Sequence, residues 1–112
     1  MRRAQRLRRP ADFLRVRELG SRGVPHPLLV MYAAPNDLGT TRVGITVSGR
    51  VGKAVVRNLV RRRLREAVRA RQNQLPPATD IVIAARQASA AATWTELNAA
   101  LDSVLKRLGQ AR

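Results

Sequence analysis

Apolar and basic positions recur with the period of a helix throughout residues 50–71. At about 100° per residue, side chains four positions apart lie near one line along a helix. One such line carries the basic stripe, which we define as Lys53, Arg57, Arg61 and Arg65. The stripe is widened by Asn58, Arg62 and Arg69, and the opposite arc is apolar: Val55, Val56, Leu59, Val60, Leu64 and Ala67. The pattern predicts a helix that buries this arc and turns its basic stripe outward.

Two strands are predicted before this helix. Residues 28–34 form an apolar run of strand length that ends in a turn-rich segment. The alternation in residues 42–48 places three apolar side chains on one face: Val43, Ile45 and Val47. Because a loop of moderate length separates the two runs, we predict that they pair as an antiparallel hairpin.

The remaining apolar segments predict a buried strand and two further helices. Residues 80–85 are almost continuously apolar, which is typical of a strand buried on both faces. Residues 11–19 predict a short helix, and Thr93 and Glu96 form a capping box at the start of a longer one. The apolar stripe of this last helix consists of Leu97, Leu101, Val104, Leu105 and Leu108. Trp94, at its start, is predicted to be a packing residue.

The order of these elements predicts an α/β (α+β) fold in which helices pack on one sheet. A chain of 112 residues is long enough for a single domain with one core, here residues 1–112. Because aromatic residues make up only 3% of the chain, this core is expected to consist of Leu, Val, Ile and Ala. Residues 1–9 form a basic arm that we expect to be mobile in the free protein.

Charge narrows the class of partner. The net charge is +15, from 22 Lys and Arg residues against 7 Asp and Glu residues, and this imbalance favours phosphate polyanions. No segment approaches the roughly 18 apolar residues of a membrane span, and the basic arm lacks the apolar run of a signal peptide. The absence of cysteine argues against a disulfide framework and a thiol nucleophile. We therefore expect a cytoplasmic protein that binds nucleic acid and has no membrane partner.

Side chains suited to catalysis are scarce. His26, the only histidine, lies between two prolines in a predicted loop. The acidic residues are scattered singly, without a close pair for acid–base chemistry or metal binding. We therefore predict no catalytic residue and no metal site in the protein, whose chemistry is binding.

The type of nucleic acid follows less directly from the residues. A basic helix could enter the DNA major groove, but a helix-turn-helix needs a supporting helix where this chain has a predicted strand. The signatures of RRM and KH domains are absent, and the low aromatic content argues against a stacking platform for single strands. Guanidinium groups suit structured RNA, because they bind phosphate bidentately and also stack.

Residues 42–48 (RVGITVS) and 51–66 (VGKAVVRNLVRRRLRE) form two adjoining motifs. Together they resemble the signature of the bacterial ribonuclease P protein family, which also has a basic arm, a first helix, a strand like that of Asp80 and a closing helix at these places. The resemblance implies a two-layer sandwich of three helices and a small mixed sheet, with the basic helix in a left-handed βαβ crossover. It further implies the protein subunit of the ribonucleoprotein endonuclease that removes the 5′ leader from precursor tRNA.

The same resemblance implies the partners. In that family the catalytic RNA performs the reaction with Mg²⁺, while the protein binds this RNA and the precursor tRNA leader. The leader is held in a cleft between the first helix and the sheet. The resemblance implies no cofactor bound by the protein alone, and we predict no protein partner.

The resemblance also implies roles for individual residues of this chain that match positions of the family's motif. The RNA-binding positions are Arg50, Lys53, Arg57, Asn58, Arg61, Arg62 and Arg65. The positions of the leader cleft are Phe13, Arg17, Met31 and Thr46. Leu59 departs from the family by replacing an arginine, and Arg17 and Met31 replace aromatic residues. Because Tyr32 is expected to face away from the cleft, the cleft should hold the leader more by the charge of Arg17 than by stacking.

Two other functions remain open on the residues alone. A structural RNA-binding protein of the ribosomal type would present the same basic surface. A DNA-binding regulator is disfavoured by the missing supporting helix and by the lack of any sign of a dimer interface. Composition does not separate the ribosomal-type protein from a ribonuclease P subunit, and only the motifs within residues 42–66 do so.

Overall fold

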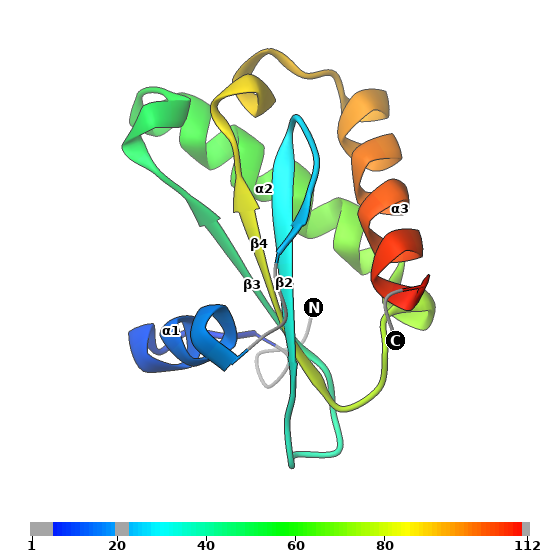
Figure 1. The fold of residues 1–112 in the computed structure, drawn as a ribbon. Helices are drawn as coiled ribbons and strands as arrows, with labels where there is room; N and C mark the ends of the chain where they lie inside the picture. Colours follow the sequence, from blue (N-terminus) through cyan, green and yellow to red (C-terminus); the bar gives the residue numbers. More distant parts are fainter. Residues whose placement is uncertain (1–5, 20–22, 111–112) are drawn as a thin grey trace.

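A computed structural model describes residues 6–19 and 23–110 of the chain (Figure 1). The described residues form three α-helices and four strands, with short 3₁₀ turns between them. The helices are α1 (Pro10–Leu19), α2 (Ala54–Arg69) and α3 (Trp94–Gln110). The strands are β1 (Val24–Pro25), β2 (Leu29–Pro35), β3 (Arg42–Val47) and β4 (Thr79–Ala85). Each predicted helix and strand is present with small shifts at its ends, whereas the predictions for residues 1–5 lie outside the described residues.

The strands form one mixed sheet in the order β1-β2-β4-β3. β4 pairs antiparallel with β2, where Val82 is opposite Tyr32, and parallel with β3, where Val82 is opposite Gly44. The predicted hairpin of β2 and β3 is therefore wrong, because β4 lies between them.

Burial explains the central place of β4. Ile81, Val82 and Ile83 are all at most 1% exposed, so this strand needs apolar cover on both of its faces. A strand of this kind is most stable in the interior of a sheet. β3 alternates between apolar and polar residues, so it can lie at the edge of the sheet. β4 therefore pairs between β2 and β3, although β2 and β3 are neighbours along the chain.

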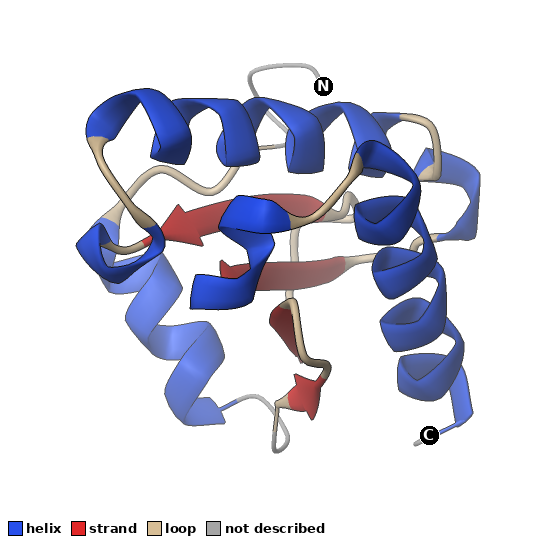
Figure 2. Cartoon of the chain, turned by 90° about the horizontal axis from the view of Figure 1, so that it is seen from above, coloured by secondary structure: helices blue, strands red, loops and turns tan. Residues whose placement is uncertain are grey.

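The two faces of the sheet carry different helices (Figures 1 and 2). α2 and α3 pack on one face and form the main core with residues such as Met31 and Ile81. α1 packs on the opposite face over β2 and β4, where a smaller apolar cluster includes Val16 and Val82. The sheet and the α2–α3 layer match the predicted two-layer sandwich, and α1 adds partial cover to the second face.

The apolar arc of α2 is buried only beyond its first turn. Val60 and Leu64 are at most 3% exposed, whereas Val55 is 80% exposed and Leu59 is half-buried. The prediction that Val55 is buried is therefore wrong, because the closely packed part of α2 begins at Val60. Trp94 is 43% exposed and does not belong to the core, in contrast to its predicted packing role.

The last helix begins as predicted. The Thr93 backbone N–H donates to Glu96 Oε1 at 2.8 Å, and the Glu96 N–H donates to Thr93 Oγ1 at 3.1 Å. These reciprocal bonds form a capping box and satisfy backbone donors at the start of α3. The predicted apolar stripe of α3 is buried. None of the helices in the described ranges has the length and apolar character required to cross a membrane.

Candidate nucleic-acid interface

The basic stripe lies on the side of α2 that the core leaves uncovered. Lys53 is exposed, and Arg57, Arg61 and Arg65 are half-buried along the helix. The other positions with predicted RNA contacts, Arg50, Asn58 and Arg62, are all exposed. α2 has no acidic residue in its first turn, so no carboxylate there reduces the positive field.

Two side chains of this surface have informative hydrogen bonding. Arg61 Nη1 donates to Asn58 Oδ1 at 3.0 Å, which holds the two side chains together on the outer face of α2. Arg57 Nε is buried and has no hydrogen-bond partner among the described residues. The rest of the Arg57 side chain is partly accessible, so its terminal N–H groups are the ones that a ligand could contact.

The basic arm continues the positive surface across the free edge of the sheet. The Leu7 N–H donates to Val43 O at 3.0 Å, and Arg6 forms a parallel bridge with Val43 on the edge strand β3. Leu7 is only 5% exposed. The arm therefore lies against β3 at Arg6 and Leu7, and its mobility in the free protein stays a prediction. Docking also covers an edge that would otherwise expose unpaired backbone groups.

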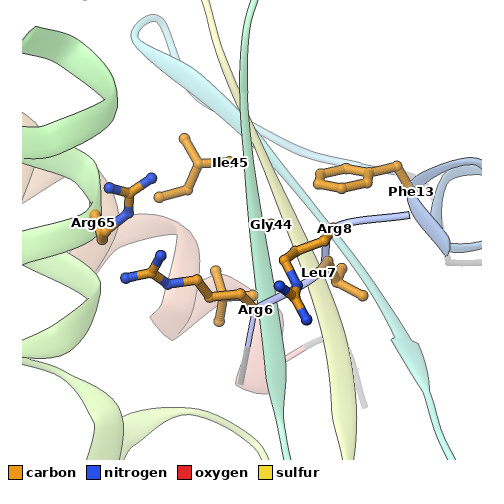
Figure 3. A pocket seen from close by; sticks show the side chains of 8 residues that line it. Arg6, Leu7, Arg8, Phe13, Gly44, Ile45 and Arg65 are labelled. Atoms are coloured by element: carbon orange, nitrogen blue, oxygen red, sulfur yellow. The ribbon is translucent and has the colours of Figure 1, made fainter. Parts of the chain in front are cut away.

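A small pocket joins the arm to α2 (Figure 3). It has a volume of about 170 Å³ and is lined by residues of the arm, β3 and α2 together with Phe13 of α1. Arg6 and Arg65 extend into the same space beside Ile45, and Arg8 follows on the arm (Figure 3). Three arginines line this pocket and no acid does, so it forms a surface for anions.

The ring of Phe13 lies directly over Gly44 on the α1 face of the sheet. A Cβ atom at Gly44 would be 2.4 Å from Cε1 of Phe13 and 2.9 Å from Cβ of Leu7. A side chain at this position therefore conflicts with both α1 and the arm. Glycine at position 44 is what permits the close approach of these two segments to β3.

Gly44→Ala is expected to lower the free energy of unfolding by about 1–3 kcal/mol, the usual cost of overpacking. The added methyl group must displace Phe13 or Leu7. Urea denaturation followed by circular dichroism measures the change. Gly49→Ala is the matched control, because a Cβ atom there would meet nothing within 4 Å. Equal stabilities of the two variants would show that Phe13 does not pack on Gly44.

The predicted cleft between α1 and the sheet is present as a groove of about 350 Å³. Arg17 of α1 and Thr46 of β3 line it, together with neighbouring residues of β3 and β4. The guanidinium carbon of Arg17 is 5.2 Å from the centroid of the Tyr32 ring, a cation–π distance. Arg17 and Thr46 are thus brought together as predicted.

Two predicted cleft residues lie outside this groove. Phe13 lines the pocket beside the arm instead. Met31 is 1% exposed and belongs to the core under α2 and α3, on the face opposite to α1. Tyr32 belongs to the cluster on the α1 face instead. The predictions for Met31 and Tyr32 are therefore reversed. Their apolar run is continuous, so period-two alternation could not identify the face of either side chain.

A buried ion cluster lies on the other side of α1. The Asp80 side chain is fully buried and accepts hydrogen bonds from Arg42 Nε at 2.9 Å, Arg42 Nη2 at 2.7 Å and Asn36 Nδ2 at 2.7 Å. Arg15 of α1 also forms an ion pair with it, and Asp12 lies 3.7 Å from Arg42. Sequence analysis missed this cluster, because its members are far apart along the chain.

The protonation of the cluster follows from these contacts. Burial raises the pKa of Asp80, but the hydrogen bonds from Arg42, Asn36 and Arg15 and the charge of Arg42 outweigh it, and the net pKa is below its ordinary value. The hydrogen bond to Asp80 raises the pKa of Arg42 despite partial desolvation. At neutral pH the cluster is therefore a fully charged network.

Side chains with catalytic potential do not converge on this surface. His26 Nδ1 accepts a hydrogen bond from the Leu28 N–H at 3.0 Å, so the imidazole stabilises the turn before β2. Burial and the nearby Arg107 lower its pKa. In the part of the chain that the structure describes, no group of three or more His, Cys, Asp or Glu side chains could hold a metal ion.

Comparisons with known proteins agree with this geometry. A family model described as Ribonuclease P matches residues 1–109. The ribonuclease P protein component of Herpetosiphon aurantiacus is 41% identical over 96% of this chain and 86% of the relative. That of Roseiflexus castenholzii is 44% identical over 97% of this chain and 89% of the relative.

Solved structures show the same relationship. The RNase P protein of Staphylococcus aureus superposes with a TM-score of 0.87 and 33% identity, covering 95% of this chain and 96% of that one. The RNase P protein of Thermotoga maritima gives a TM-score of 0.81 and 29% identity, covering 91% and 96%. The chain therefore belongs to the bacterial ribonuclease P protein family, the protein components of the ribonucleoprotein endonuclease that matures the 5′ end of tRNA.

Proposed function

We propose that the basic surface of α2 binds the RNA subunit of ribonuclease P through phosphate contacts. The residues assigned to this role are Arg50, Lys53, Arg57, Asn58, Arg61, Arg62 and Arg65. The observation that carries the assignment is the basic stripe itself, which lies on the side of α2 away from the core and has no acidic residue in the first turn of the helix. The accessible guanidinium N–H groups of such a stripe can form charge-assisted hydrogen bonds with phosphate oxygens.

The second proposed role is binding of the precursor tRNA leader in the groove between α1 and the sheet. Arg17 and Thr46 line this groove. We assign them to leader binding together with Phe13, which lies beside the groove over Gly44, and replace Met31 by Tyr32, which lies on the α1 face. Arg17 is 5.2 Å from the Tyr32 ring centroid, so the pair offers a stacked guanidinium with donors free for a phosphate or a base. This arrangement favours holding the leader by charge more than by aromatic stacking.

In this proposal the RNA subunit performs the hydrolysis and uses Mg²⁺, while the protein positions the substrate. The described residues offer no cluster of metal-ligating side chains to the reaction. The protein acts in the cytoplasm as one RNA-binding domain over residues 1–112, without a protein partner. The β3–α2–β4 connection joins neighbouring parallel strands, and the family resemblance supports a left-handed crossover for it.

Reconstitution tests these roles. Cleavage of precursor tRNA by a bacterial ribonuclease P RNA is followed at low magnesium, with and without the protein. We expect the protein to restore leader removal, because its positive surface replaces part of the cation requirement for bringing two RNAs together. An unrelated basic protein at equal concentration controls for charge alone.

The opposite outcome has a specific meaning. If the protein binds the ribonuclease P RNA no better than an unrelated RNA and leaves cleavage unchanged, the proposed contacts are wrong. A structural role of the ribosomal type would then be the better account of the basic surface.

A further inference from the structure

The short helix α1 presents three different sides. At about 100° per residue, Val16 lies between two flanks, with Asp12 and Arg15 on one and Phe13 and Arg17 on the other. Val16 is completely buried against the sheet, so the two flanks emerge on opposite sides of the contact line. A rotation of α1 about its axis would therefore move both flanks together.

The flank of Asp12 and Arg15 is tied to the sheet by charge. Arg15 forms an ion pair with the buried carboxylate of Asp80, and Asp12 lies 3.7 Å from Arg42. Arg42 in turn forms two hydrogen bonds to Asp80 at 2.9 and 2.7 Å. The cluster thus connects α1 to both β3 and β4 through one acid that water does not reach.

Apolar contacts alone hold α1 weakly. Val16 is its only buried residue, Leu14 is 57% exposed, and Leu19 is 70% exposed. A helix with one buried side chain and a partly buried Phe13 has little to fix its rotation. The ionic contacts are directional, so they supply the orientation that the apolar contacts do not.

We propose that Asp80 is a positioning residue that, through Arg15, sets the rotation of α1 and so places Arg17 at the leader groove and Phe13 over Gly44 beside it. This inference rests on the proposed binding of the leader in that groove. Asp80 does not need to touch the RNA, because its side chain is fully buried beneath α1. Its contribution is to hold the opposite flank of the same helix.

The geometry separates this effect from binding of the RNA subunit. α2 lies on the other face of the sheet. The Asp80 carboxylate contacts Arg15 of α1, Arg42 of β3 and Asn36 of the loop after β2. A change at Arg15 should therefore weaken leader recognition and leave the α2 surface as it is.

The test uses Arg15→Gln, which removes the ion pair while keeping a long polar side chain. Holoenzyme assembled with the catalytic RNA is titrated with precursor tRNAs that carry a long leader or only a single leader nucleotide. The affinity gain from the long leader is expected to fall on the order of tenfold, the equivalent of one lost hydrogen bond to a charged group. Affinity for the RNA subunit is expected to remain unchanged.

Matched variants control for charge and for chemistry. Lys106→Gln removes one positive charge from the exposed side of α3 and should preserve the gain. Arg15→Lys keeps the charge and part of the hydrogen bonding, so it should retain much of the affinity gain from the long leader. Asp80→Asn tests the acid itself and should behave like Arg15→Gln where it folds.

The orientation of α1 can also be measured directly, as a distance between α1 and α3. Because the chain has no cysteine, spin labels can be attached at Leu14→Cys on α1 and Ala99→Cys on α3, both exposed positions. One narrow distance distribution is expected with Arg15 present, and a broader or shifted one with Arg15→Gln. An unchanged distribution together with an unchanged leader gain would overturn the inference.

Failure of the proposed function would look different. If the unsubstituted protein shows no affinity gain from a long leader, the leader groove is wrongly assigned. The spin-label distances then decide alone whether Asp80 orients α1, and an unchanged distribution in Arg15→Gln refutes that role too.

Discussion

Leu64→Ala is expected to lower the free energy of unfolding by about 2–5 kcal/mol. Leu64 is 0% exposed and lies in the main core between α2 and the sheet. Removing its branched end loses burial and leaves a cavity that the neighbouring strands and α3 cannot fill, because they are fixed in regular structure. Urea denaturation measured by circular dichroism gives the value directly.

Val55→Ala provides the control for this experiment. Val55 lies on the same helix, but it is 80% exposed, so its truncation removes little buried surface. Alanine also has the higher helix propensity, which makes a small gain in stability the expected result. A Leu64→Ala variant as stable as Val55→Ala would show that the assigned faces of α2 are wrong.

The helices and strands could be predicted because their patterns are local. The basic stripe and apolar arc of α2, the alternation of β3 and the capping box of Thr93 and Glu96 each identify an element from neighbouring residues. Pairing between strands is not local in this sense. The hairpin of β2 and β3 was expected from their proximity, whereas the continuous burial of β4 places it between them.

The site was predictable to the extent that it lies on α2. A helix gives each side chain a fixed direction, so the basic stripe could be placed outside from spacing alone. Met31 and Tyr32 lie in a run in which the residues on both faces of the strand are apolar. Which face each side chain takes therefore follows only from the pairing of β2 with β4. Met31 was assigned to the cleft from the family resemblance, and the structure places Tyr32 on that face instead.

The Asp80 cluster could not have been predicted from spacing at all. Asp12, Arg15, Asn36, Arg42 and Asp80 meet only after α1, β3 and β4 have come together. In the sequence Asp80 is a single acid at the start of an apolar run, and nothing near it in the chain identifies its partners. A charged residue at the start of a buried strand is a signal to search for partners on neighbouring elements.

Replacing Arg57, Arg61 and Arg65 together by alanine is expected to abolish tight binding of the ribonuclease P RNA. Each phosphate contact contributes about one unit to the slope of log Kd against log salt, so the triple variant should flatten it by about three units. The fold should be retained, because alanine favours helix and the removed like charges repel one another along the stripe. Filter binding at several salt concentrations measures the slope.

Controls on other elements separate specific contacts from loss of net charge. Arg86→Ala and Lys106→Ala remove two exposed charges outside α2. If the basic stripe makes the contacts, these changes should alter the slope much less per charge than changes at Arg57 or Arg61. Equal slopes per charge would mean that the RNA responds to net charge alone. The alignment of the stripe along one line of α2 argues against that outcome, because guanidinium groups at a fixed spacing can each contact a phosphate, whereas diffuse attraction depends little on where the charges lie.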